Sequence, residues 1–341
     1  MTNILQSEIW AQFQESNGHK VFRGSGEGWS YLATLEGGKT GRYLYSPYGP
    51  VAESAEAFEA AIADMKRVAA ENKCWFLRVE PTNPGIWGEL SGEAFLRARG
   101  FKPSPRQVQP GHTQIIDLEK SEEEILKDMK STNRNLHRNI HKKGVTFTVS
   151  QNPADLDILL KFLDETAGRT GFNRQGDSYL KKVASVLMPA DAASLYIAKV
   201  EDESIGAAFI YDSDDTRTYA HAAASFEHRK LSAGIPLVTN LILDAKAKGL
   251  KYVDLFGIAP NDDPNHEWAG FTKFKKSFGG RSVAYPGTWD LPVDSRLYTA
   301  YTGIYAAKSK LPVLKRKLTE VRAKAVPAVK NIASNLRSKV G

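Results

Sequence analysis

Three lysines lie close together in the segment EWAGFTKFKKSFGG, residues 267–280. At about 100° per residue, a helix here gathers the aromatic side chains on one face, which carries Phe271, Phe274 and Phe278. Lys275 falls beside this stripe, whereas Lys273 and Lys276 point away from it. A lysine held against aromatic rings is partly desolvated, so its ammonium can stabilise negative charge that develops during a reaction. The alternative is a lysine whose stem covers apolar surface while its head stays in water, and helix geometry leaves both open.

Other catalytic signatures are largely missing from the chain. It has no GxSxG, HExxH, P-loop or zinc-type cysteine pattern. The single cysteine, Cys74, lies in an apolar strand pattern, where a buried thiol is a poor nucleophile. In PNDDPNHEW (260–268), Asp262, Asp263, His266 and Glu267 favour a polar loop over a metal site because prolines and asparagines surround them. The glycines of RGSGEGW (23–29) favour a hairpin turn over a phosphate loop because no helix pattern follows.

Two stretches of the chain show the same order of expected elements. The first runs through strand patterns to a helix at 53–72 and then to the strand CWFLRVEP. The second runs through three strand patterns to a helix with Ser232 as N-cap and Gly249 as its end, followed by the strand KYVDLFGI. At 341 residues the chain exceeds the usual size of one core. The sequence therefore predicts two α/β units of similar topology.

The segment between the two units, residues 122–145, has helical periodicity. One stripe is apolar and carries Leu126, Met129, Leu136 and Ile140. Cations recur every four residues on a second stripe, formed by Lys130, Arg134, Arg138 and Lys142. We expect one helix here, with the basic stripe as a solvated face.

Positive charge is concentrated at the end of the chain. The net charge is +7, yet residues 306–341 hold ten Lys or Arg and one Glu. Apolar residues recur among these lysines at intervals of three and four, as in a helix that lies on a membrane surface. An anionic partner for this tail, by peripheral contact with the membrane or with RNA, is one hypothesis, and a helix packed on the first domain is the other. The sequence shows no signal peptide or membrane span, so we expect a cytoplasmic protein, held by the tail at the inner face of the plasma membrane.

Several motifs together resemble those of one known family. The main one is YVDLFGIAPNDDPNHEWAGFTKFKKSFGG at 252–280. Further pieces follow the same order along the chain: LQSEIW at 5–10, LYSPYGPV at 44–51, LRVEP at 77–81, QPGHTQIIDL at 109–118 and AAASFEHRKL at 222–231. The chain resembles the FemABX peptidoglycan-bridge aminoacyltransferases, and in particular the compact FemX-like members without a coiled-coil arm.

The resemblance implies an α/β protein of two tandem GNAT-like domains, with mixed sheets flanked by helices. Residues 1–111 would form the first domain, completed by 284–341, and 112–283 the second. The implied enzyme is a tRNA-dependent aminoacyltransferase. It would transfer an amino acid from aminoacyl-tRNA to the stem-peptide amine of a peptidoglycan precursor, lipid II or UDP-MurNAc-pentapeptide, during bridge formation. No cofactor is implied beyond the aminoacyl-tRNA co-substrate, and no metal.

The resemblance also carries roles for individual residues. Lys275, paired with Phe274, matches the contact to the tRNA end and the transition state. Glu80 matches a carboxylate proposed as a base, although an ion pair with Arg78 is a simpler role for it. The remaining matches are expected to bind substrate: Arg174 at precursor phosphates, Tyr219 and Asp254 in the cleft, Arg78 and Tyr48 beside them, and Gln14 where relatives carry a phosphate-binding lysine.

Two other functions fit the same sequence. One is an acyltransferase of this fold that uses a different donor, although HRKLSAGIPL (228–237) lacks the glycine spacing with which GNAT enzymes hold coenzyme A. The other is a noncatalytic relative that binds RNA or a membrane, which the Gln14 replacement makes conceivable.

Overall fold

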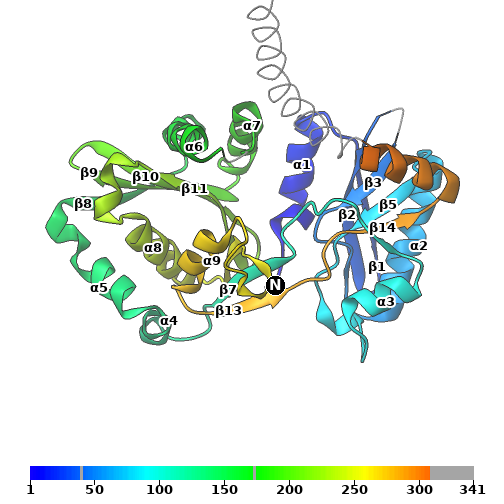
Figure 1. Ribbon diagram of the computed structural model, residues 1–341, viewed down its shortest axis with the longest axis horizontal. Helices are drawn as coiled ribbons and strands as arrows, with labels where there is room; N and C mark the ends of the chain where they lie inside the picture. Colours follow the sequence, from blue (N-terminus) through cyan, green and yellow to red (C-terminus); the bar gives the residue numbers. More distant parts are fainter. Residues whose placement is uncertain (39–40, 172–173, 308–341) are drawn as a thin grey trace, which may run out of the picture.

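The computed structural model describes residues 1–38, 41–171 and 174–307, and it contains two mixed β-sheets, each flanked by helices (Figure 1). The expected basic tail at 306–341 lies, apart from its first two residues, outside the described residues. Two α/β domains of this type confirm the predicted fold class.

The first sheet has the strand order β1-β2-β3-β5-β14-β6, with β4 paired to β2. Only β3 and β5 in this sheet run parallel. Helices α2 (Ala55–Glu71) and α3 (Gly92–Ala98) pack on it. Its strands are β1 (Val21–Gly26), β2 (Trp29–Glu36), β3 (Tyr43–Ser46), β4 (Val51–Ala52), β5 (Phe76–Val79), β6 (Lys102–Pro103) and β14 (Trp289–Pro292).

The second sheet has the order β13-β7-β12-β11-β10-β9-β8, with β11 and β12 parallel. Its strands are β7 (His112–Asp117), β8 (Val145–Ser150), β9 (Ala193–Val200), β10 (Glu203–Asp212), β11 (Thr216–Ala224), β12 (Tyr252–Gly257) and β13 (Arg281–Ala284). One face packs on α4 (Glu122–Asp128), α5 (Ser131–Asn139) and α8 (Gly234–Ala247). The other packs on α6 (Leu156–Thr170) and α7 (Asp177–Leu187), and the short α9 (Ala269–Lys276) follows β12.

Local sequence explains where several of these elements begin and end. The Ser54 side chain accepts a hydrogen bond from Ala57 N and caps α2, whose apolar stripe is buried. The glycines of residues 23–29 form the expected hairpin, in which Gly26 pairs with Trp29. Helix α8 ends as predicted before Gly249, which has φ +81°. Its predicted N-cap was wrong, because Ser232 is in the left-handed region and Ala233 occupies the cap position without a side-chain hydrogen bond.

The single helix predicted for residues 122–145 is also corrected by the structure. The backbone becomes extended at Met129 and Lys130, so α4 and α5 are separate helices that meet at a corner. The Arg134 guanidinium fills this corner and donates to the carbonyls of Lys127, at 2.9 Å, and Met129. Arg134 therefore closes the end of α4 instead of extending a solvated basic stripe.

Strand β14 inserts a late part of the chain into the first sheet, between β5 and β6. A buried ion pair holds it there: Arg78 Nε and Nη2 donate to the two carboxylate oxygens of Asp290 at 2.7 and 2.9 Å. The guanidinium also lies 4.9 Å from the ring centroid of Tyr43 and 5.9 Å from that of Tyr301. Aromatic faces and a bidentate carboxylate together satisfy this buried cation.

Helix α1 (Glu8–Ser16) joins the two domains, and it lies between them in Figure 1. Its apolar side belongs to a core shared with α6, α7 and the second sheet. The Trp10 ring lies 6.1 Å from Tyr211, and Phe13 lies 5.3 Å from Tyr179. Because these aromatic contacts are buried, the two sheets are held in one fixed arrangement.

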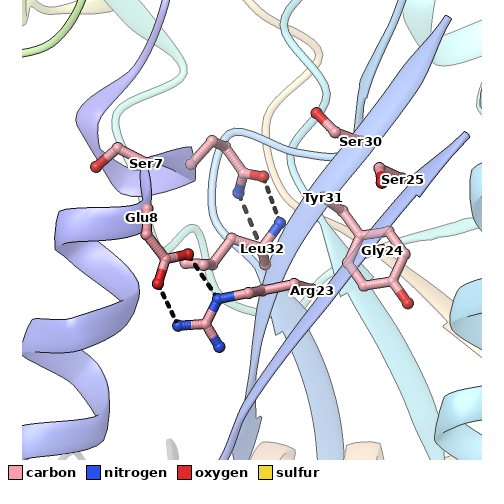
Figure 2. A pocket seen from close by; sticks show the side chains of 9 residues that line it. Ser7, Glu8, Arg23, Gly24, Ser25, Ser30, Tyr31 and Leu32 are labelled. Atoms are coloured by element: carbon pink, nitrogen blue, oxygen red, sulfur yellow. Dashed lines mark hydrogen bonds and ion pairs between the residues drawn. The ribbon is translucent and has the colours of Figure 1, made fainter.

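A depression of about 260 Å³ lies where α1 meets the β1–β2 hairpin, and no residue of the lysine-bearing helix α9 lines it (Figure 2). Several of its polar groups are paired with one another. Arg23 donates to both oxygens of Glu8, at 2.7 and 2.8 Å, and the Gln6 amide exchanges hydrogen bonds with the backbone of Leu32. These contacts hold α1 on the first sheet.

Substitution of Arg78 by Ala should strongly destabilise the protein, because Asp290 would remain buried without its partner. Breaking a buried pair in this way typically costs about 3–5 kcal/mol. Urea unfolding followed by circular dichroism measures the change. The control is Arg67→Ala, which removes a guanidinium exposed on α2 that pairs with Asp64 and Glu71. The control should shift the midpoint little, and an equally small shift for Arg78→Ala would contradict the role of the ion pair.

Candidate active site

The amino group of Lys275, a half-buried residue, is held by a hydrogen bond near the end of β12. Its Nζ donates a hydrogen bond to the carbonyl oxygen of Gly257 at 2.8 Å. Burial disfavours the charged form and lowers the pKa of Lys275 to about 8, although the nearby Asp254 carboxylate acts in the opposite direction. The Lys275 side chain is therefore mostly protonated at pH 7 and becomes neutral as the pH rises through about 8.

The neighbouring lysines have different surroundings. Lys273 is exposed on the outside of α9, and Lys276 pairs with Asp262. The Phe274 and Phe278 rings pack edge to face, with their centroids 5.1 Å apart. Phe271 does not belong to this cluster, because it is 52% exposed. Two of the three phenylalanines on the predicted stripe thus pack against each other.

The Asp254 carboxylate is the acidic group whose negative charge acts on Lys275. It is buried and accepts hydrogen bonds from Thr113 Oγ1 and, at 2.7 Å, from Phe256 N. Burial raises its pKa, while these donors and Lys275 lower it to a smaller extent. A cation and an anion are therefore kept in the same poorly hydrated place, in a fixed arrangement.

The strands β11 and β12 separate next to Asp254. Their parallel ladder ends at Thr218 and Asp254, although β11 continues to Ala224. Beyond this point β12 has an irregularity in its pairing with β7, and Phe256 adopts φ +64°. Gly257 has no room for a side chain, since a Cβ there would lie 3.0 Å from Trp268 and 3.1 Å from Pro110. Residues 219–223 of β11 are in consequence only half-buried in the middle of the sheet.

The two faces of β11 present different groups to this opening. Tyr219 pairs with Ile210 and packs with the core on the α8 side. Thr218 and Asp254 share the opposite face, because partners in register point the same way. The expectation that Tyr219 and Asp254 line one cleft is therefore corrected: they lie on opposite faces of the sheet.

His221 is a site residue that the sequence analysis missed. A one-residue irregularity after Tyr219 returns His221 to the face of Asp254, where its ring lies 6.0 Å from Tyr211. Burial lowers the pKa of His221 to about 4, so the ring is neutral at physiological pH. The signal in the sequence is a lone histidine in the alanine-rich strand TYAHAAAS.

Two tyrosines lie near the site: Tyr48 comes from the first domain and Tyr285 from the connection between the domains. Tyr48 is buried, and its hydroxyl donates to the Pro110 carbonyl at 3.2 Å. Its ring lies 5.9 Å from that of Tyr285. Burial raises the pKa of both tyrosines, and the charge of Asp254 adds to the effect. The lysine, Asp254 and these hydroxyls therefore lie near one another where the two domains meet.

Glu80 and Arg78 both lie in buried networks of hydrogen bonds. The Glu80 carboxylate is buried and accepts hydrogen bonds from Tyr45 Oη at 2.7 Å, Gln109 N at 3.0 Å and Thr288 Oγ1. These bonds tie the end of β5 to both connections between the domains, and the expected role of Glu80 as a base stays a prediction. Arg78 pairs with Asp290 and not with Glu80, and it is too deeply buried to bind substrate.

The two residues expected at phosphates belong to other elements than Lys275. Arg174, before α7, forms ion pairs with Asp164 and, at 2.6 Å, with Asp177. A phosphate would have to compete with two carboxylates there, so the geometry does not favour the expected role. Gln14 is half-buried on α1, and its backbone carbonyl accepts from His19 N at 3.0 Å.

The loop before α9 is the polar loop that the sequence predicted. His266 Nδ1 accepts a hydrogen bond from Trp268 N at 3.0 Å, and Asp263 accepts from Asn265 N at 2.9 Å. Across the part of the chain that the structure describes, no three His, Cys, Asp or Glu side chains are grouped to hold a metal ion. The same part of the chain has no helix long and apolar enough to cross a membrane.

The Lys275 ammonium should titrate near pH 8, well below the ordinary lysine value of about 10.4. Carbon NMR of protein labelled at lysine Cε measures this midpoint, and the resonance missing from Lys275→Met identifies the group. Because the buried charge is unfavourable, Lys275→Met should unfold at no lower urea concentration than the wild type below pH 8. The wild type should gain stability relative to the variant as pH rises from 8 to 10.5. A Lys275 midpoint near 10.4 would contradict this burial.

Comparison with known proteins places this geometry in context. Residues 127–268 match the family model described as an acetyltransferase (GNAT) domain. The lipid II:glycine glycyltransferase of Staphylococcus epidermidis is 27% identical over 159 residues, which cover 44% of this chain and 37% of that protein. The chain thus matches little more than a third of the length of these first relatives.

Two further matches cover most of the chain. Aminoacyltransferase FemA of Staphylococcus aureus is 20% identical over 359 residues, which span 80% of this chain and 84% of FemA. The crystal structure of FemX superimposes with a TM-score of 0.77 at 18% identity, covering 87% of this chain and 94% of FemX. The chain is thus similar in sequence to these Fem proteins and is built on two domains of the GNAT fold.

Proposed function

We propose that this protein is a tRNA-dependent aminoacyltransferase of peptidoglycan bridge synthesis. It moves an amino acid from aminoacyl-tRNA to the stem-peptide amine of a precursor, lipid II or UDP-MurNAc-pentapeptide. Support for the reaction class comes from the relatives, which are named lipid II:glycine glycyltransferase and aminoacyltransferase FemA. The observation in this chain that carries the proposal is the buried, hydrogen-bonded amino group of Lys275.

The chemistry needs orientation and charge stabilisation more than a protein nucleophile. The acceptor amine attacks the carbonyl carbon of the aminoacyl ester, and a C–N bond forms while the carbonyl oxygen becomes an oxyanion. The C–O bond to the tRNA ribose then breaks, the amine loses a proton and the ribose oxygen gains one. Cys74 takes no part, because burial raises the pKa of its thiol to about 11. The amino acid arrives already activated, so no further cofactor is required.

Lys275 is suited to the charge that this reaction develops. Its ammonium is present at neutral pH and poorly hydrated, so its interaction with an oxyanion or with the terminal phosphate of tRNA is strong. The Gly257 carbonyl fixes the position of its Nζ, and the Asp254 charge favours the ammonium form. We place the reacting groups on the sheet face that carries Asp254 and His221, in the opening between β11 and β12.

The acceptor places the enzyme close to a membrane if it is lipid II. We therefore propose that the protein works in the cytoplasm, at the inner face of the plasma membrane where the lipid-linked precursor is exposed. The basic tail at 306–341 is proposed as the membrane contact; almost all of it lies outside the described residues.

Transfer of a radiolabelled amino acid from charged tRNA to purified UDP-MurNAc-pentapeptide, or to lipid II in detergent, tests the proposed function. Lys275→Met should lower kcat by about 10²–10³, the usual effect of removing one donor to an oxyanion. The matched control is Lys276→Met, one residue away and paired with Asp262 at the surface, which should stay near wild-type activity.

The donor is tested by pretreating the charged tRNA with ribonuclease, which should abolish transfer. Activity that survives the treatment, or that appears with acetyl-CoA in place of charged tRNA, would assign the fold to a different acyl donor. Wild-type activity in Lys275→Met would remove the lysine from the mechanism.

A further inference from the structure

A surface of unpaired positive charge covers the corner between α4 and α5. We call it the α5 basic surface, and its exposed members are Lys127, Lys130, Arg138, His141, Lys142 and Lys143. Residues 127–143 contain six Lys or Arg and a single acid, Asp128, which pairs with Lys120. Within the described residues, none of the five exposed Lys and Arg side chains of this surface has an acidic partner within 4.0 Å, so their charges face solvent without neutralisation.

The α5 basic surface has a fixed shape. Arg134 lies inside the corner and donates to the α4 carbonyls, so it holds α4 and α5 together. At the other end, Gly144 with φ +72° closes the 3₁₀ turn η3 (Ile140–Lys143) that continues α5. The exposed cations are thus presented from a rigid backbone, which reduces the entropy lost when they bind a partner.

The composition of this surface favours a nucleic acid over a lipid bilayer. Its apolar side chains, such as Met129 and Ile140, are buried against the second sheet's core, so no large apolar group is exposed among the cations. An interfacial membrane helix needs such groups to insert between lipids. The exposed neighbours are instead hydrogen-bonding side chains, Ser131, Thr132 and Asn135, of the types that contact phosphate and sugar in nucleic-acid complexes.

The α5 basic surface is joined directly to the helix that carries Lys275. Lys130 N donates to the Ser277 carbonyl at 2.9 Å, at the start of α5. The buried Asn133 side chain donates to Ser277 Oγ at 2.8 Å and to its carbonyl at 3.2 Å. Ser277 is two residues after Lys275, and Figure 1 shows α4, α5 and α9 in the same part of the second domain. The start of α5 is therefore fixed against the end of α9, the helix that carries Lys275.

We infer that the α5 basic surface binds the phosphodiester backbone of the donor tRNA. The inference rests on the proposed function, because Lys275 then meets the esterified end while α5 holds the adjoining phosphates. These contacts set the affinity for tRNA and leave the chemical step to Lys275. They carry no sequence information, so they serve equally for different tRNA bodies.

Fluorescence anisotropy with labelled, uncharged bacterial tRNA at 50 and 200 mM KCl tests the inference. The variant Lys130→Ala/Arg138→Ala/Lys142→Ala should raise the Kd about 10–100-fold at the lower salt. It should also reduce the slope of log K against log [KCl] by about two to three, because each lost phosphate contact removes close to one unit. The control, Lys66→Ala/Lys161→Ala/Lys230→Ala, removes three exposed lysines elsewhere and should stay within about twofold.

Transfer kinetics separate this inference from the proposed function. The triple variant Lys130→Ala/Arg138→Ala/Lys142→Ala, here the α5 variant, should have a higher KM for charged tRNA and an unchanged kcat at saturating tRNA. Lys275→Met should instead have a lower kcat. If the wild type transfers from tRNA but the α5 variant binds tRNA like the control, the α5 assignment is overturned and the function stands. If the α5 variant loses binding to phosphatidylglycerol vesicles but keeps its binding to tRNA, the α5 basic surface is a membrane contact and the tRNA assignment is overturned. Wild-type protein that neither binds tRNA nor needs it for transfer would overturn both proposals.

Discussion

The burial of helix α1 between the two sheets is the constraint on which the site depends. Trp10 and Phe13 come from the first domain, yet they pack in a core made largely by the second. With this joint fixed, Tyr48 and Tyr285 are brought close enough to Asp254 for its charge to affect their pKa values. A site assembled from two domains keeps its geometry only if the joint between them does not move.

Lys275 shows how the fold supports an unfavourable charge. Burial lowers its pKa by more than the attraction of Asp254 raises it, so the folded protein holds this ammonium at some loss of stability. The strain at Phe256, the close packing around Gly257 and the early end of the β11–β12 ladder all lie within a few residues of its partner. Unfavourable local features that cluster in this way are typical of functional sites.

Some of this arrangement could be predicted from the sequence because it follows from local patterns. Periodicity alone distinguished Lys275 from Lys273 and Lys276, and it also placed α2 and the end of α8. The break between α4 and α5 carries no proline or glycine, so a continuous helix was the natural expectation. What makes the break favourable is the Arg134 side chain binding carbonyls five to eight residues earlier, which a helical wheel does not represent.

Contacts between distant residues explain the remaining differences. Arg78 was expected to bind substrate, but its partner Asp290 is 212 residues away, and β14 brings the two together. Glu80 similarly receives a donor from Thr288. Tyr219 and Asp254 were assigned to one cleft because both are polar and near strand ends, whereas strand register places them on opposite faces. The one-residue irregularity in β11 after Tyr219 places His221 on the same sheet face as Asp254. The place of His221 in the site is therefore visible only from the strand pairing.

The central claim is that this protein adds an amino acid to peptidoglycan stem peptides through a site built around Lys275. Mass spectrometry of muropeptides from cells that lack the gene tests it most directly, with complementation by the wild type and by Lys275→Met. The account predicts that the deletion removes one or more amino-acid residues from the stem-peptide side chain, that the wild type restores them, and that Lys275→Met does not. Identical muropeptides with and without the gene would contradict it.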